Sequence, residues 1–202
     1  MRHINDAGLA LIERNEGLRV AAYRDIAGIW TIGYGHTGSD VHAGLVITAE
    51  RATELLRQDV GHAEAAVDAA THDVPTTDNQ FSAMVSLAFN IGVAAFRKSS
   101  VLRIHRAGNY ATAADAFLLW DKAHVNGTLV TVHGLLRRRG EERALYLQAA
   151  PAQPTKPVPR LVPRMAPPEP IPVPPPVIPP VPVPVPPPLS WWQRVIQQVL
   201  GR

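Results

Sequence analysis

Two carboxylates and a hydroxyl, from Glu16, Asp25 and Thr31, stand close together in one glycine-rich stretch, ERNEGLRVAAYRDIAGIWTIGYGH at residues 13–36. Hydrolysis of a glycosidic bond needs a protonated acid at the leaving oxygen and a second group that places water or stabilises the developing cation. Glu16 follows an apolar segment, where desolvation would raise its pKa, whereas Asp25 lies in a turn whose backbone donors would keep it ionised. Thr31 would help Asp25 to hold water. Spacing alone leaves the alternative open that these acidic residues are solvated or cap backbone groups.

The elements around this stretch are expected to be a helix, a small sheet and a second, longer helix. Asn5 and Asp6 can cap a helix that ends near Asn15. Residues 17–36 alternate β-branched and aromatic residues with glycine, which predicts a hairpin or a three-stranded sheet. A long helical pattern, TAERATELLRQDVGHAEAAV, begins at Thr48 and is followed by Pro75. Glu16 would therefore lie at the junction between a helix and the sheet.

The later part of this region has helical patterns only. They occupy residues 79–92, 99–108, 109–120 and 134–148. Thr77 or Asp78 can cap the first, which is apolar enough to run through the core and which Gly92 would end. Asn126-Gly127 marks a turn before the last. One small sheet followed by many helices predicts an α+β fold and not a wound parallel sheet.

Composition divides the chain near residue 150. Of its 20 prolines, Pro75 alone precedes that point. A compact domain does not contain prolines at the density seen after it, because each one removes a backbone donor and fixes φ. We therefore expect a folded domain at residues 1–150, a polyproline II linker at 151–189 and a short cationic amphipathic helix at 190–202. The linker is interpreted as a stiff spacer, with an SH3-like ligand as the alternative.

The charge and the cysteine content argue against nucleic-acid-binding and metal-binding proteins. Residues 1–150 carry 15 Lys and Arg against 16 Asp and Glu, so the net charge of +3 belongs to the tail, and we expect no nucleic-acid partner. The basic run RRRGEER at 137–143 is interpreted as a solvated helix face paired internally through Glu141 and Glu142. The chain has no cysteine, and its eight histidines show no paired metal-ligand spacing. We expect no metal and no cofactor.

The pattern of Glu16, eight residues, Asp25, five residues and Thr31 resembles the catalytic signature of phage-type lysozymes, the T4-like endolysins of glycoside hydrolase family 24. Further blocks resemble that family in the same order and cover nearly all of residues 1–148. They are EGLR at 16–19, TIGYGH at 31–36, TAERATELLRQDV at 48–60, QFSAMVSLAFNIG at 80–92 and GLLRRRGEERALYL at 134–147. The resemblance implies a lysozyme-like fold, with a small N-terminal sheet and a mostly helical C-terminal lobe.

The resemblance also implies a role for each residue of the signature. Glu16 would be the general acid, and Asp25 with Thr31 would position the attacking water on the opposite face of the sugar, which implies inversion at the anomeric carbon. The bond would be the β-1,4 link between N-acetylmuramic acid and N-acetylglucosamine in bacterial peptidoglycan. Gly28, Gly33 and Gly35 would let the hairpin turn sharply and approach a bulky saccharide.

Other positions correspond to further features of the family. His36 and Asp59 align with a structural ion pair between the hairpin and the long helix, although a histidine beside an active site can also act as a general base. The saccharide cleft of the family corresponds to Thr37, Phe89, Asn90 and Ser99. Phe89 is equally consistent with a core position, because its helix is apolar on all sides.

The last segment, SWWQRVIQQVLGR at 190–202, separates apolar and polar residues on a helical wheel. It is too short to span a bilayer. We predict that Trp191, Trp192 and Arg194 contact an anionic membrane surface or lipopolysaccharide. The alternative is that this helix docks on the domain or self-associates.

Together these features predict a monomeric endolysin that hydrolyses peptidoglycan and lyses the host cell. The N-terminus lacks a long apolar run, so we expect no signal peptide, residence in the host cytoplasm, and later release to the periplasm and cell wall. A lytic transglycosylase and a non-catalytic wall-binding or membrane-perturbing protein are the alternatives. Asp25 and Thr31 argue against the first, and Glu16 argues against the second.

Overall fold

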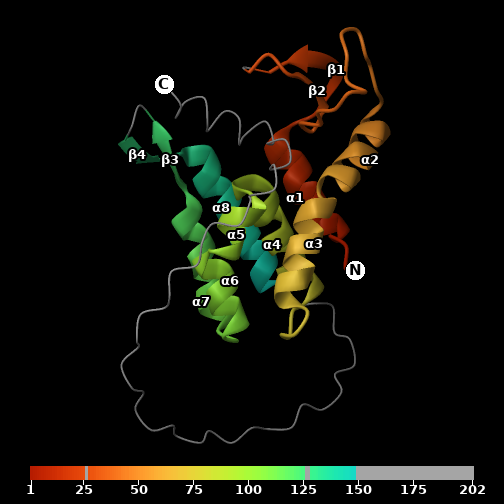
Figure 1. Cartoon of the computed structure of the whole chain (residues 1–202). Helices are drawn as coiled ribbons and strands as arrows, with labels where there is room; N and C mark the ends of the chain where they lie inside the picture. Colours follow the sequence, from red (N-terminus) through yellow and green to blue (C-terminus); the bar gives the residue numbers. More distant parts are fainter. Residues whose placement is uncertain (26, 126–127, 149–202) are drawn as a thin grey trace, which may run out of the picture. The chain divides into compact units, whose positions relative to one another are not determined.

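The computed structural model describes residues 1–25, 27–125 and 128–148, which form helices and two small antiparallel hairpins (Figure 1). The helices are α1 (Asp6–Glu16), α2 (Ala49–Asp59), α3 (Gly61–Thr71), α4 (Asp78–Ile91), α5 (Val93–Arg97), α6 (Ser100–Arg106), α7 (Tyr110–Phe117), the 3-10 turn η1 (Leu118–Trp120) and α8 (His133–Leu147). The strands are β1 (Arg19–Arg24), β2 (Trp30–Gly33), β3 (Lys122–Val125) and β4 (Thr128–Thr131). The predicted α+β class is confirmed. The Asn126-Gly127 turn, the linker and the terminal helix lie outside the described residues.

Several helix ends lie where local capping chemistry predicts them. The side chain of Asn5 accepts a hydrogen bond from the Gly8 N–H at the start of α1. Thr77 begins α4 through a reciprocal capping box with Gln80. Gly92 ends α4 with φ of +88°, a conformation that favours glycine. These boundaries needed no tertiary information.

The long helix expected from Thr48 onward is two helices, α2 and α3, so that prediction is wrong in this detail. Val60 joins them, and its carbonyl accepts from the N–H groups of both Ala63 and Glu64 at 2.9 Å. The next residue is Gly61, which disfavours a helix interior by about 1 kcal/mol relative to alanine. The apolar period continues across this break, so periodicity alone does not reveal it.

The first hairpin pairs β1 with β2 and packs on α2. Tyr23 lies opposite Thr31 in the register. A third strand is represented only by an isolated bridge between Ala21 and Val46. Gly33 has φ of +64°, and a Cβ there would lie 3.3 Å from the Cβ of Ala52 on α2. Gly33 therefore permits close packing of the hairpin on α2, and its approach to a saccharide stays a prediction.

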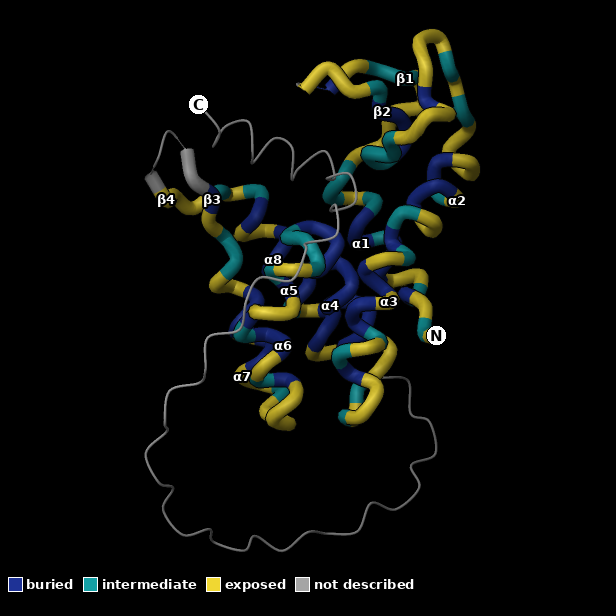
Figure 2. The backbone as a smooth tube through the Cα atoms, viewed as in Figure 1, coloured by how far each residue is buried: buried dark blue, intermediate teal, exposed yellow. Residues whose placement is uncertain are grey.

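The main core surrounds α4, which is buried along most of its length and contacts α1, α3, α5 and α8 (Figures 1 and 2). A smaller apolar cluster of Ile32, Val41 and Leu55 lies beneath the first hairpin. The second hairpin, β3–β4, is absent from the sequence-based expectation of one small sheet. Within the part of the chain that the structure describes, no helix combines the length and apolar character needed to cross a membrane.

An ion pair joins the turn after β2 to the end of α2. Nδ1 of His36 lies 2.9 Å from Oδ1 of Asp59, and its Nε2 lies 3.4 Å from Oδ2 of Asp40. The hydrogen bond to Asp59 raises the pKa of His36, and partial burial opposes this only in part. The structure therefore brings His36 and Asp59 together in the arrangement expected of a structural pair.

This pair predicts a pH-dependent stability. Because the folded-state pKa of His36 is raised, its stabilisation is complete below the unfolded value of about 6.5 and is lost as pH rises through the folded value. We expect His36→Asn to lower Tm most near pH 6 and progressively less at higher pH, as measured by thermal unfolding. The exposed His42 provides the control, since His42→Asn should change Tm little at any pH. A deficit in His36→Asn that stays constant from pH 6 to pH 9 would contradict the prediction.

Candidate active site

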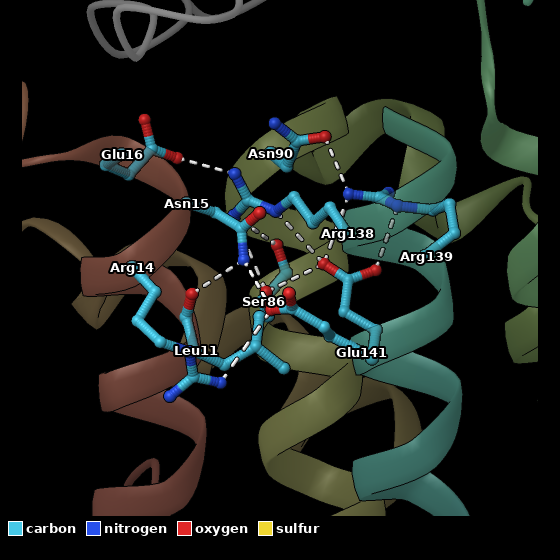
Figure 3. A network of polar contacts seen from close by, with 10 residues as sticks. Leu11, Arg14, Asn15, Glu16, Ser86, Asn90, Arg138, Arg139 and Glu141 are labelled. Carbon is cyan, nitrogen blue, oxygen red and sulfur yellow. Dashed lines mark hydrogen bonds and ion pairs between the residues drawn. The ribbon is translucent and has the colours of Figure 1, made fainter. Parts of the chain in front are cut away.

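Glu16 is the last residue of α1 and directly precedes the first hairpin. Gly17 ends the helix with φ of +76°, and its N–H donates to the carbonyl of Glu13. The side chain of Glu16 is completely buried, and its Oε1 accepts a hydrogen bond from Nη1 of Arg138 at 2.7 Å (Figure 3). The first and last helices of the fold therefore meet at the candidate acid.

A buried charge cluster, consisting of Glu16, Arg138, Arg139 and Glu142, surrounds this contact. The three members on α8 are 2%, 0% and 0% exposed, in sequence order. Oε1 of Glu142 accepts from Nε of Arg138 at 3.2 Å and from Nη2 of Arg139 at 3.1 Å. The Ser86 hydroxyl on α4 donates to the same oxygen at 2.7 Å. With both glutamates ionised the charges balance, which offsets part of the cost of burying them.

The interpretation of RRRGEER as a solvated helix face is wrong for Arg138, Arg139 and Glu142. The predicted pairing within the helix does occur for Glu142, but Glu141 lies outside the cluster and instead accepts from Asn15 Nδ2 at 2.9 Å. The reason is that α8 turns this side toward α4 and α1, where Glu16 supplies a second negative charge.

Burial raises the pKa of Glu16, and the positive charge of Arg138 offsets this only in part. The second carboxyl oxygen, Oε2, has no hydrogen-bond partner among the described residues. A buried carboxyl with one unbonded oxygen can hold a proton closer to neutral pH than an exposed glutamate can. Glu16 thus has the electrostatic surroundings of a general acid.

Asp25 and Thr31 lie on the first hairpin and are both bonded to Ile29. Oδ1 of Asp25 accepts from the N–H groups of Ala27 and Ile29 at 2.9 and 2.8 Å. The Thr31 hydroxyl donates to the carbonyl of Ile29 at 3.1 Å. Asp25 is 7% exposed and Thr31 is fully buried. The turn therefore gives the second carboxylate a polar environment, in contrast to the dry and highly charged surroundings of Glu16.

Asn90, at the end of α4, is part of the polar network around the cluster. Its Oδ1 accepts from Nη2 of Arg139 at 2.8 Å (Figure 3). Its Nδ2 has no hydrogen-bond partner within the described part of the chain. Asn90 also borders a small hollow, together with Asn15, Gly134, Leu135, Arg137 and Arg138. The hollow therefore adjoins the arginine that pairs with Glu16.

The other residues expected at a saccharide cleft have varied surroundings. Thr37 is half-buried, just after the hairpin. Phe89 belongs to the main core at 7% exposure, and its ring lies 6.3 Å from that of His62. Ser99 is buried, and its hydroxyl accepts from the Leu102 N–H as the cap of α6. Sugar contact by these three residues stays a prediction, and for Ser99 the structure shows a capping role.

The buried cluster that Arg138, Arg139 and Glu142 form with Ser86 is absent from the sequence-based expectation. A signal was present, because residues 138, 139 and 142 continue the helical spacing of the buried Leu135 and Leu145. Charged residues in register with an apolar stripe indicate a buried ionic cluster.

The described residues contain no group of three or more His, Cys, Asp or Glu side chains that could hold a metal ion.

Removal of Arg138 should destabilise the protein strongly. Arg138→Met leaves Glu16 and Glu142 buried without their shared partner, and breaking a buried pair in this way costs about 3–5 kcal/mol. The free energy of unfolding can be measured by urea denaturation. Arg137→Met is the matched control, because Arg137 precedes Arg138 on α8 but is exposed. This substitution should change the free energy of unfolding by less than about 0.5 kcal/mol. Equal effects of the two substitutions would show that the buried pair has no special role in stability.

Comparison with known proteins places this geometry in a family. The family model described as phage lysozyme matches residues 13–142. An endolysin of Acyrthosiphon pisum secondary endosymbiont phage 1 is 45% identical over 147 residues, which cover 73% of this chain and 99% of the relative.

Two solved structures resemble the fold as well as the sequence. An endolysin from Escherichia coli O157:H7 phage FAHEc1 is 42% identical with a TM-score of 0.68, over 75% of this chain and 98% of that one. The muramidase domain of SpmX from Asticaccaulis excentricus is 44% identical with a TM-score of 0.68, over 73% of this chain and all of that one. The buried acid between the first and last helices therefore lies in a fold shared with endolysins and a muramidase domain, and the chain belongs to the phage lysozyme family.

Proposed function

We propose that this chain is an endolysin, a lysozyme that hydrolyses the glycan strands of bacterial peptidoglycan and so lyses the host cell. The observation that supports this most directly is the fully buried side chain of Glu16 at the junction of α1 and the first hairpin, where burial raises its pKa. A carboxyl group in this state can protonate the leaving oxygen of a glycosidic bond. Membership of the phage lysozyme family supports the same reaction.

In the finer mechanism that we propose, Asp25 and Thr31 position the attacking water. Hydrogen bonds to the backbone of Ile29 hold both side chains beside the same turn of the hairpin. An activated water that attacks opposite the leaving group inverts the anomeric carbon. The bond is the β-1,4 link from N-acetylmuramic acid to N-acetylglucosamine, in the manner of T4-like enzymes of glycoside hydrolase family 24. Thr37, Phe89, Asn90 and Ser99 remain the candidates for saccharide contacts.

Substitution of Glu16 tests the reaction. Glu16→Gln keeps the shape of the side chain but cannot donate the proton, and general acid catalysis contributes about 10²–10⁴-fold. We expect a loss of at least that size in the release of reducing ends from purified peptidoglycan. Glu54→Gln is the control, because Glu54 pairs with Arg51 on the exposed side of α2.

The chain ends that appear on digestion discriminate between the enzymatic alternatives. Hydrolysis produces new reducing ends, whereas a lytic transglycosylase produces anhydro-muramic ends. Undiminished lysis of permeabilised bacteria by Glu16→Gln would favour a non-catalytic, wall-binding or membrane-perturbing protein and would remove the enzymatic proposal.

We also propose a domain organisation in which each segment of the chain has its own role. Residues 1–150 form the catalytic domain, 151–189 a polyproline II spacer and 190–202 a cationic amphipathic helix that contacts an anionic membrane or lipopolysaccharide. The proline content supports the spacer, and the family match ends at residue 142. The protein would act as a monomer at the cell wall, after accumulation in the host cytoplasm and release by a separate membrane lesion.

Deletion of residues 190–202 tests this arrangement. We expect the truncated chain to lose most of its activity on cells with an intact outer membrane, because Trp191, Trp192 and Arg194 are absent. Its hydrolysis of purified peptidoglycan should remain within about twofold of the full chain, since the deletion does not include any proposed catalytic residue. Turbidity loss of intact cells provides the first measurement, and release of reducing ends provides the second. Equal action of both chains on intact cells would exclude the membrane role.

A further inference from the structure

Glu142 joins both arginines of the buried charge cluster and Ser86 through one of its oxygens. Its Oε1 accepts from three donors, on Arg138 at 3.2 Å, Arg139 at 3.1 Å and Ser86 at 2.7 Å. Its Oε2 lies 3.0 Å from Nε of Arg139, although the two are not aligned for a hydrogen bond. Charge-assisted hydrogen bonds are about twice as strong as neutral ones. Glu142 is therefore the fixed point that holds both arginines.

Arg138 is divided between two carboxylates. Its Nη1 donates to Glu16 and its Nε donates to Glu142. A guanidinium that faced Glu16 alone would strongly favour the ionised carboxylate, which cannot donate a proton. The second carboxylate opposes that effect, because it shares the positive charge of Arg138 and repels a negative charge on Glu16.

Few other charges face this cluster. From α4 it meets the neutral side chains of Ser86 and Asn90. From α1, Arg14 points to Glu141 outside the cluster, at 3.7 Å. Arg137 on α8 is exposed. Apart from burial itself, the charges that act on Glu16 are thus those of the three charged residues of α8.

We propose that Glu142 is a positioning residue for the reaction: it holds Arg138 against Glu16 and shares the charge of Arg138, so that Glu16 can take up the proton that it donates. This inference rests on the proposed role of Glu16 as the acid. The proton passes from Glu16 to the leaving glycosidic oxygen as the bond to the anomeric carbon breaks. Water supplies the hydroxyl on that carbon, and its other proton passes to the carboxylate of Asp25. Glu16 is then a carboxylate 2.7 Å from Arg138, and the cluster is neutral. Arg138 therefore stabilises the acid after donation, while Glu142 prevents it from ionising the acid too early.

Opposite changes of charge on α8 test this role. The pKa of Glu16 can be measured in the full chain without substrate, by ¹³C NMR titration of labelled glutamate carboxyl carbons, with Glu16→Gln to assign the signal. We expect Glu142→Gln to lower the pKa of Glu16 and Arg139→Gln to raise it. The alkaline limb of the pH–activity profile on purified peptidoglycan should move in the same directions. Glu142→Gln should therefore recover activity at lower pH, whereas a purely structural defect would reduce activity at every pH.

Glu141→Gln is the matched control, since it removes the same charge from the adjacent position on α8 but outside the cluster. It should leave the pKa of Glu16 and the alkaline limb in place. If Glu142→Gln does not fold, the direction in which Arg139→Gln shifts the pKa of Glu16 tests the inference. An unmoved pKa of Glu16, or shifts of both variants in one direction, would overturn the inference. Full activity of Glu16→Gln would instead overturn the proposed function, and the titration separates the two cases.

Discussion

Nη1 of Arg138 and Oε1 of Glu16 meet at 2.7 Å, and this buried pair joins α8 to α1. The two residues are 122 positions apart, so the contact forms only when α8 packs against α1 and α4. Two charges removed from water are costly unless further hydrogen bonds satisfy them. Glu142 accepts from Arg138, and the Ser86 hydroxyl donates to Glu142, so the glutamate of α8 and the small hydroxyl residue of α4 together support the pair.

The two candidate carboxylates have opposite environments, and the fold creates that difference from adjacent elements. Glu16 ends a helix whose preceding turns are buried in the main core. Asp25 lies in a tight turn that supplies two backbone N–H groups to one of its oxygens. The hairpin that contains this turn is tied to α2 by His36 and Asp59 and packs closely at Gly33. Acid and base roles at one pH require such a contrast.

The parts of the fold that could be predicted depend on neighbouring residues, and those that could not depend on distant ones. The caps at Asn5 and Thr77 and the stop at Gly92 are local, because each side chain or φ value satisfies its own helix end. The break at Val60 is hidden because the apolar period continues through it. The site divides in the same way. Glu16, Asp25 and Thr31 form a local pattern, whereas the burial of Arg138 and Arg139 depends on α1 and α4. The sequence of α8 gives only their helical register with the apolar residues of that helix.

Buried ion clusters are weak evidence for stability, because well-packed apolar residues of similar volume often stabilise a protein as much or more. A stability argument therefore does not explain why four ionisable groups occupy this position. The cluster also leaves Nη1 of Arg139 without a hydrogen-bond partner among the described residues, and burial lowers the pKa of Arg139 to about 10. A buried charge whose hydrogen-bonding groups are only partly satisfied is costly in a purely structural site. It is expected where the net charge must change during the reaction, because a cluster that is neutral with Glu16 ionised is necessarily one charge more positive when Glu16 holds its proton.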